Sequence, residues 1–339
     1  MKALVFKRYG GPDQVAFADI PRPVPKPDEI LVQVYAAGLN PIDNMIPKGT
    51  FKAILRFQLP ATLGSDLAGV VVEVGNRVTR FKPGDAVFAN IFDLGTGALA
   101  EFAAVPEYAA ALKPANLDFV QAASIPMVGL TSWQALKERA LVKPGQKVLI
   151  PAGAGGIGTF AIQFAKHLGA KVATTTSTGN VDLVRSLGAD EVIDYTKQQF
   201  EDVLRDYDAV LGTVKGDAIE KSLRILKPKS IVVSLVGPPD AAFGRARDEL
   251  FHGVRVRAAE PQDNSPRQET RHRVFIPVRA SRRRPTRGDR RASRGGEHPA
   301  GDRQGISVRS SEGGACVSRE GSGQGKGRRT AEVNPAMIR

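Results

Sequence analysis

The pattern of hydrophobic and polar positions changes once along the chain, near residue 118. Before that point, short runs rich in β-branched residues are bounded by Gly, Pro and Asp. They predict strands at 30–35, 69–75, 86–88 and 98–105. Many short strands separated by such residues are typical of a compact, partly closed β-domain. We therefore expect residues 1–125 to form a β-rich domain.

After residue 118, helical and strand periods follow one another. Two helical segments separated by Gly129 are expected between residues 120 and 140. Strands at 148–150, 171–176, 191–195, 208–211 and 231–236 then alternate with helices at 159–168, 181–187, 200–204 and 219–226. This alternation predicts an α/β fold with a parallel, doubly wound sheet. The pattern supplies one strand fewer than the usual dinucleotide-binding sheet contains.

A glycine motif lies in the turn between the first of these strands and its helix. Gly153, Gly155 and Gly158 form G-x-G-x-x-G before a helix that ends at Gly169. A dinucleotide site needs glycines there for a tight turn, for close approach of the backbone to a pyrophosphate, and for helix–strand packing. The phosphates would meet the free N–H groups at the positive end of the helix. A purely structural glycine turn is the alternative.

Length and composition narrow the class of protein. A chain of 339 residues is long enough for two domains. No apolar run approaches the roughly 18 residues of a membrane helix, and residues 1–10 read as a strand rather than a signal peptide. The single cysteine, Cys316, excludes a disulfide within one chain. We expect a soluble, cytoplasmic protein without a membrane partner.

The net charge of +13 is concentrated at one end of the chain. Residues 251–339 hold 20 basic and 9 acidic side chains, whereas residues 1–250 hold 28 basic and 26 acidic ones. The same 89 residues contain no Leu, Tyr or Trp, so they offer too little apolar surface to offset the entropy of ordering. Three interpretations are open: a disordered Arg-rich tail, a segment that binds nucleic acid through its phosphates, and a translation artefact.

Six short motifs lie within residues 1–245: GLNPID at 38–43, LGSDLAG at 63–69, FKPGD at 81–85, GALAE at 97–101, GLTSW at 129–133 and AGAGGIG at 152–158. Together they make the chain resemble the medium-chain dehydrogenase/reductase superfamily, in its zinc-independent quinone oxidoreductase branch. The resemblance implies a GroES-like substrate domain over 1–125 and a Rossmann domain over 126–247. It also implies hydride transfer from NADPH to a quinone or an α,β-unsaturated carbonyl, and a homodimer.

The resemblance ends near Arg247, and the genetic code offers a reason. Read one base later, permitted codons for residues 271–279 spell GIAYSFLF, those for 297–309 spell SIRPVIDRVFPF, and those for 323–329 spell GKGKVV. A stop codon is permitted at 332–334. These words resemble the last sheet strand and the C-terminal segment of the family, in the right order. We therefore interpret residues 248–339 as an irregular, Arg-rich tail translated out of frame, and we expect no nucleic-acid partner.

Metal is not expected in the site. The zinc-dependent relatives place Cys and His ligands near the first two motifs, whereas the corresponding stretches of this chain contain neither residue type.

The alternative to an oxidoreductase is a dinucleotide-binding protein without turnover, acting as a structural or sensing module.

The cofactor is expected at the carboxyl ends of the strands, where ligands bind in such sheets. NAD enzymes usually carry an acidic residue about 20 positions after the glycines, but residues 174–178 are all Thr or Ser. Hydroxyls can donate to a 2′-phosphate, so NADPH is expected, with Asp182 as an alternative acid. The resemblance adds Tyr195 near that phosphate. The expected cofactor-binding residues are Gly153, Ala154, Gly155, Gly156, Ile157, Gly158, Thr176, Ser177, Thr178, Tyr195, Thr213 and Val236.

Three residues are candidates for the substrate side of the site. Without a metal, a carbonyl or quinone oxygen must be polarised by hydrogen-bond donors or water. Asn40 is such a donor, unless Asn40-Pro41 is merely a turn. We expect Asp43 to be structural, and Thr131 resembles a family residue on the nicotinamide side, although it could simply pack in a helix. His167 is expected at the surface of the helix after the glycines.

Overall fold

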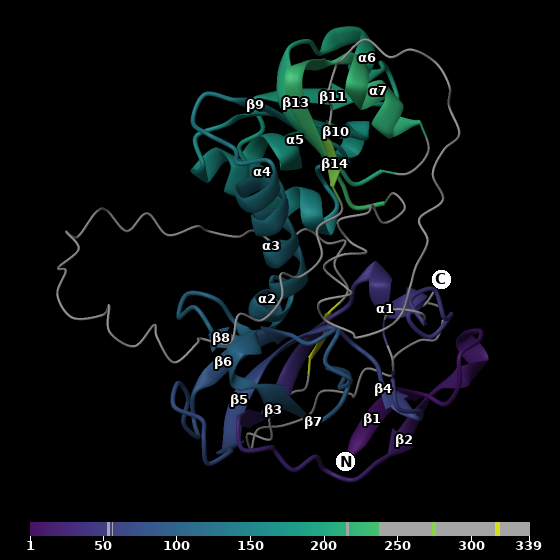
Figure 1. The fold of residues 1–339 in the computed structure, drawn as a ribbon, viewed down its shortest axis with the longest axis vertical. Coiled ribbons are helices and arrows are strands. Elements are labelled where there is room, and N and C mark those ends of the chain that lie inside the picture. The colour runs from purple at the N-terminus through teal and green to yellow at the C-terminus, as the bar shows by residue number, and fades with distance from the viewer. Residues whose placement is uncertain (53–54, 56, 215–216, 237–272, 276–315, 319–339) are drawn as a thin grey trace, which may run out of the picture. The chain divides into compact units, whose positions relative to one another are not determined.

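The computed structural model describes residues 1–52, 55, 57–214, 217–236, 273–275 and 316–318. The chain divides into two compact units, Met1–Gly129 with Ser310–Arg339, and Leu130–Arg309. Figure 1 shows that strands dominate the first unit, whereas strands and helices alternate in the second. The described residues contain no helix that is long and apolar enough to cross a membrane.

Two antiparallel sheets build the first unit. The smaller has the order β2-β1-β4, and the larger has the order β15-β3-β5-β6-β8, with β7 also paired to β3. The strands are β1 (Lys2–Phe6), β2 (Val15–Asp19), β3 (Glu29–Gly38), β4 (Ala61–Thr62), β5 (Asp66–Val74), β6 (Ala86–Asn90), β7 (Phe102–Pro106), β8 (Ala110–Leu112) and β15 (Cys316–Ser318). The expected β-rich domain is therefore confirmed.

The register of the larger sheet aligns three residues that matter for the site. Gly38 at the end of β3 pairs with Asp66 at the start of β5, and Asp66 pairs with Asn90 at the end of β6. The chain then turns into the short helix α1 (Pro41–Met45) directly after β3. Loop residues after β3 are thereby brought to the same edge of the sheet as Asp66 and Asn90.

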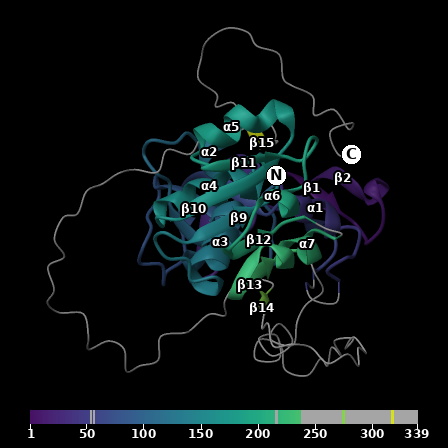
Figure 2. The same ribbon diagram turned by 90° about the horizontal axis from the view of Figure 1, so that it is seen from above.

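A parallel sheet with the order β11-β10-β9-β12-β13-β14 forms the second unit. Its strands are β9 (Lys147–Ile150), β10 (Lys171–Thr176), β11 (Glu191–Asp194), β12 (Tyr207–Gly212), β13 (Leu226–Ser234) and β14 (Arg273–Phe275). Figure 2 shows these strands following one another across the unit. The expected doubly wound sheet is confirmed, and β14 supplies the strand that the sequence pattern did not.

Alternate residues of β9 face two separate cores. Val148 and Ile150 pack in a core with residues of α4 (Gly156–His167) and α5 (Val181–Ser186). Leu149 points the other way, into a core that includes Leu204 and Ile225, near α6 (Phe200–Val203) and α7 (Ala218–Arg224). This period of two explains why a strand buried on both faces reads as a continuous apolar run.

The expected break at Gly129 is wrong. The structure has helices α2 (Phe119–Ala123) and α3 (Pro126–Trp133), followed by a π-helical segment over Gln134–Arg139. The break falls at 124–125 because a residue before proline disfavours the helical conformation, whereas Pro126 suits a first helical position. Gly129 lies inside α3, where its N–H donates to the carbonyl oxygen of Ile125 at 2.7 Å.

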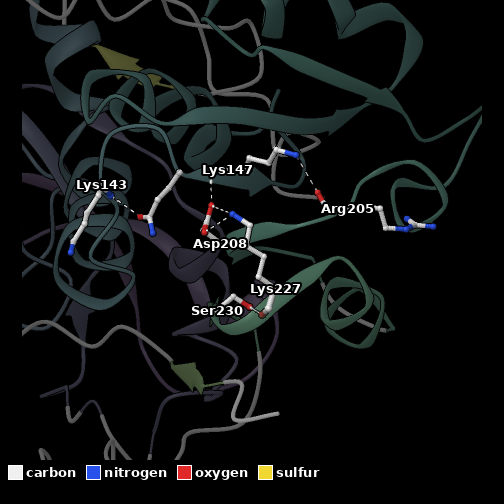
Figure 3. Close-up of polar contacts among 7 residues, drawn as sticks. Lys143, Lys147, Arg205, Asp208, Lys227 and Ser230 are labelled. Carbon is white, nitrogen blue, oxygen red and sulfur yellow. Dashed lines mark hydrogen bonds and ion pairs between the residues drawn. The ribbon is translucent and has the colours of Figure 1, made fainter.

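A polar cluster joins the amino ends of the central strands (Figure 3). The glycine turn follows the carboxyl end of β9, at the opposite edge of the sheet. The Asp208 carboxylate accepts the backbone N–H of Lys147 at 2.8 Å and the ammonium of Lys227 at 2.9 and 3.0 Å. Lys147 Nζ also donates to the carbonyl oxygen of Arg205 at 3.3 Å. These contacts join the starts of β9, β12 and β13, so this edge has a structural role.

Two short strands lie in the segment that we expected to be an irregular tail. β14 runs parallel to β13 at Ile231–Val233, and β15 runs antiparallel to β3 at Ala36–Gly38. The other residues of 248–339 lie outside the described part of the chain. The assignment of this segment as a separate, out-of-frame tail therefore stays a prediction.

Candidate functional site

The three glycines of the turn have different surroundings. A Cβ at Gly153 would lie 2.1 Å from Thr174 Oγ1, and one at Gly158 would lie 2.4 Å from the carbonyl oxygen of Ala152. A Cβ at Gly155 would meet only the Ala152 oxygen, at 3.2 Å. Gly153 and Gly158 are therefore required by packing within the protein, whereas a Cβ at Gly155 would have one close neighbour and otherwise free space.

This geometry fits a dinucleotide phosphate. Gly155 is exposed and caps the amino end of α4, whose first N–H groups have no partner within the helix. Gly156 is also exposed, and Ala154 and Ile157 are half-buried beside it. Backbone donors at the positive end of a helix, next to a glycine with free space, are the features that admit a pyrophosphate.

The hydroxyl groups at and after the end of β10 are not equally available to a ligand. Thr176 is buried, and the hydroxyl of Thr178 donates to Asp194 Oδ2 at 2.6 Å. Ser177 Oγ accepts from Asn180 Nδ2 at 3.2 Å, which leaves its own proton to be donated. Tyr195 is 56 % exposed. With respect to the described residues, Ser177 and Tyr195 are therefore the members of this group that have a hydroxyl free for a ligand.

Sequence reasoning missed Asp194, the carboxylate at the end of β11. Its two oxygens accept from the hydroxyls of Thr178 and Thr196 and from the Thr196 N–H, and Lys197 Nζ lies 3.3 Å away. The hydrogen bond from Thr178 is the largest cause that holds the pKa of this carboxyl below its usual range. Because both oxygens are occupied, Asp194 is poorly placed to accept ribose hydroxyls.

The remaining two cofactor candidates follow β12 and β13. Thr213 Oγ1 donates to the carbonyl oxygen of Pro151 at 3.0 Å, which ties the end of β12 to the glycine turn. The N–H of Val236 donates to Ser234 Oγ at 3.3 Å. Both residues are half-buried beyond the carboxyl ends of their strands, at the edge where the sequence placed them.

In the first unit, Asn40 and Asp43 belong to a buried polar network. Asn40 is the N-cap of α1, and its backbone N–H donates to Asp43 Oδ2 at 2.7 Å. The hydroxyl of Ser65 donates to the other oxygen of Asp43. Asn40 Nδ2 donates to Asp66 Oδ2 at 3.0 Å. Asp43 thus supports the turn, and burial is the main cause that raises its pKa.

Asp66 is a second residue that sequence reasoning missed, although its motif carried part of the resemblance. It is 1 % exposed and also accepts Asn90 Nδ2 at 2.7 Å and the backbone N–H of Met127 at 3.0 Å. The register of β5 and β6, which no sequence period reports, brings these groups together.

The structure also locates the two remaining candidates. Thr131 lies in α3, one turn after Met127, and is half-buried. His167 is exposed at the end of α4, with its ring 6.5 Å from that of Phe164, which agrees with the surface position expected for it.

Comparison with known families matches both halves of this architecture. The family described as "Alcohol dehydrogenase GroES-like domain" matches residues 26–115, and the one described as "Zinc-binding dehydrogenase" matches residues 156–259. Although the second description mentions zinc, the described residues contain no group of three or more His, Cys, Asp or Glu that could hold a metal ion. The absence of zinc stays a prediction.

Individual relatives indicate which branch of the family the chain resembles. The chain is 42 % identical over 255 residues to the chloroplastic NADPH-dependent alkenal/one oxidoreductase of Arabidopsis thaliana, covering 72 % of this chain but only 65 % of that relative. It is 36 % identical to the chloroplast envelope quinone oxidoreductase homolog of the same plant, covering 72 % of this chain and 77 % of the relative. The Escherichia coli quinone oxidoreductase in complex with NADPH has a TM-score of 0.66 at 27 % identity, covering 82 % and 81 % of the two chains.

These matches extend through both units and agree with the motifs found in the sequence. The identity of 36 % over more than two thirds of a quinone oxidoreductase homolog is sufficient to assign the family. The chain therefore belongs to the medium-chain dehydrogenase/reductase superfamily, in its quinone and enone oxidoreductase branch.

Proposed function

We propose that this protein transfers a hydride from NADPH to a quinone or an α,β-unsaturated carbonyl compound. The observation that carries the proposal is the glycine turn, in which a Cβ at Gly155 would meet one backbone oxygen at 3.2 Å, whereas Gly153 and Gly158 are enclosed by protein atoms. The alkenal/one and quinone oxidoreductase relatives support the substrate class, and the Escherichia coli complex supports the cofactor.

The residues divide the work between binding and polarisation. Bound NADPH would supply the hydride, so the protein has to bind and orient the cofactor and the substrate and polarise the acceptor oxygen. The backbone from Gly153 to Gly158 would hold the pyrophosphate, with Thr213 and Val236 beyond the neighbouring strands. The amide of Asn40 would donate to the acceptor oxygen, where negative charge develops. Thr131 would lie on the nicotinamide side, as the resemblance implies.

Turnover separates this proposal from a binding module without catalysis. The full chain should oxidise NADPH in the presence of a small quinone or enone, followed by the loss of absorbance of the reduced nicotinamide. The rate should be the same after dialysis against a chelator, since no zinc is expected. NADPH binding without turnover would favour the structural or sensing alternative. A rate restored only by zinc would contradict the metal-free assignment.

NADPH should bind at least roughly tenfold more tightly than NADH. Hydrogen bonds to a charged group contribute about 1.5–3 kcal/mol, and about 1.4 kcal/mol is tenfold in affinity. Ser177 and Tyr195 have hydroxyls free for a 2′-phosphate, whereas Asp194 has no free oxygen for ribose hydroxyls. Titration of both cofactors into the wild type and into Ser177→Ala and Tyr195→Phe tests this. The substitutions should weaken NADPH alone, and equal losses for NADH would contradict the assignment.

Two further expectations are not decided by these comparisons. The cytoplasm stays the predicted location, and the two plant relatives, which are chloroplast proteins, do not support it. A homodimer stays the predicted assembly, without nucleic-acid or membrane partners.

A further inference from the structure

Asp66 is a buried acid that the proposed reaction does not use. It has no ion-pair partner in the described part of the chain. Instead it accepts three hydrogen bonds, from Asn40 Nδ2, Asn90 Nδ2 and the Met127 N–H. A carboxylate accepts hydrogen bonds only, so three donors match its ionised form.

Burial opposes that ionisation. Desolvation is the largest cause that raises the pKa of Asp66 to about 7, against the three hydrogen bonds that lower it. The neighbouring ionisable group is Asp43, whose negative charge raises the pKa further. An uncompensated buried carboxylate costs stability, and such groups concentrate at functional sites.

The contact with Asp66 decides which way the Asn40 amide points. An ionised acceptor at 3.0 Å requires the NH2 group, rather than the carbonyl oxygen, on that side. Asn40 and Asp43 also form a capping box, in which the Asn40 side chain faces the Asp43 backbone N–H. Within the described part of the chain, the hydrogen bond to Asp66 engages one N–H of the Asn40 amide and leaves the second N–H to donate to a substrate.

The same carboxylate also holds the start of α3. It accepts the N–H of Met127, and Thr131 follows one helical turn later, on the same face of the helix. Asp66 therefore holds both the amide of Asn40 and the first turn of α3, through one buried group.

We propose that Asp66 is a positioning residue, which holds the amide of Asn40 with an N–H directed to the acceptor oxygen of the substrate. This inference rests on the proposed function, because the role of Asn40 as donor is assigned there. Asp66 itself contacts neither substrate nor cofactor in this proposal. It acts by fixing the orientation of Asn40.

The orientation of the Asn40 amide can be measured without following the reaction. In the full chain labelled with [15N]asparagine, the side-chain amide signal of Asn40 should move with pH, with an inflection near pH 7 as Asp66 gains its proton. In Asp66→Asn the inflection should disappear. The signal of Asn44, which is exposed on α1, should move in neither protein. An Asn40 signal unaffected by Asp66→Asn would overturn the proposal.

Kinetics then test whether Asp66 acts through Asn40. Asp66→Asn should lower kcat roughly 10- to 100-fold, as expected for a misplaced catalytic group, with KM for NADPH within about twofold of wild type. Asn40→Ala should cause a similar loss, and the double variant should lose no more than Asn40→Ala alone. Losses that multiply in the double variant would show that the two residues act independently, against the proposal.

A matched variant controls for the loss of a buried carboxylate. Glu29 is 8 % exposed in the same unit and pairs with Lys26 at 3.1 Å. Glu29→Gln should lower the melting temperature while leaving kcat unchanged. If the wild type shows no turnover with any quinone or enone, the proposed function fails, whereas the Asn40 signal still decides whether Asp66 orients the amide.

Discussion

Gly155→Val should weaken NADPH binding roughly 100-fold, about 2.7 kcal/mol, in a protein that stays folded. A Cβ at this position meets one protein atom, the Ala152 oxygen at 3.2 Å, and the backbone (φ −77°, ψ 166°) suits any residue. After a shift of a few tenths of an ångström away from this oxygen, the valine would occupy the space proposed for the pyrophosphate. Isothermal titration measures the affinity, and the melting temperature should stay within about 3 °C.

Two other glycines control this experiment. Gly11→Val adds the same side chain where nothing lies within 4 Å, so it should change neither affinity nor stability. Gly158→Ala should lower the melting temperature, because its Cβ would lie 2.4 Å from the Ala152 oxygen and 2.6 Å from Gly153 Cα. Wild-type affinity in Gly155→Val would mean that the motif is only a structural turn.

Correcting the reading frame by one base after about codon 247 should convert a poorly active, aggregation-prone chain into a soluble, dimeric NADPH oxidoreductase. This stays a prediction from the sequence, because the comparisons do not test the reading frame. The shifted frame permits the family's last strand and C-terminal segment, and the written frame holds no Leu after Leu250.

The described strands show where the correction would act. Among the described residues, β14 pairs with Ile231–Val233 of the nine-residue strand β13. Unpaired N–H and C=O groups along a strand promote association between chains. A longer sixth strand would cover them, and in the resembled family this strand is the edge where two subunits commonly join.

The comparison needs both proteins and the gene. Resequencing the coding DNA around codons 244–256 shows which frame is native. The written and corrected chains are then compared by size-exclusion chromatography and by NADPH consumption with a quinone. A written chain that elutes as a stable species and turns over at the rate of the corrected one would disprove the frameshift.

Local patterns in the sequence determined the fold class and the cofactor edge. Strand-forming runs, the glycine spacing and the apolar face of α4 depend on residues close together in the chain, and they predicted the β-rich unit, the doubly wound sheet and the turn from Gly153 to Gly158. The predicted break between α2 and α3 was wrong because it was placed at Gly129. The residue before Pro126 disfavours the helical conformation more strongly, and the break falls there.

Only the tertiary structure decided which polar groups are free. Asp194 and Thr178 are 16 residues apart, and their hydrogen bond commits a hydroxyl that the sequence offered to the cofactor. Asp66 meets Asn40, Asn90 and Met127 from three other parts of the chain, through strand register and helix placement. Sequence periods report which face of an element is apolar, but a hydrogen bond between distant residues depends on how the elements pack. That packing gave the glycines their separate roles and gave Asn40 its orientation.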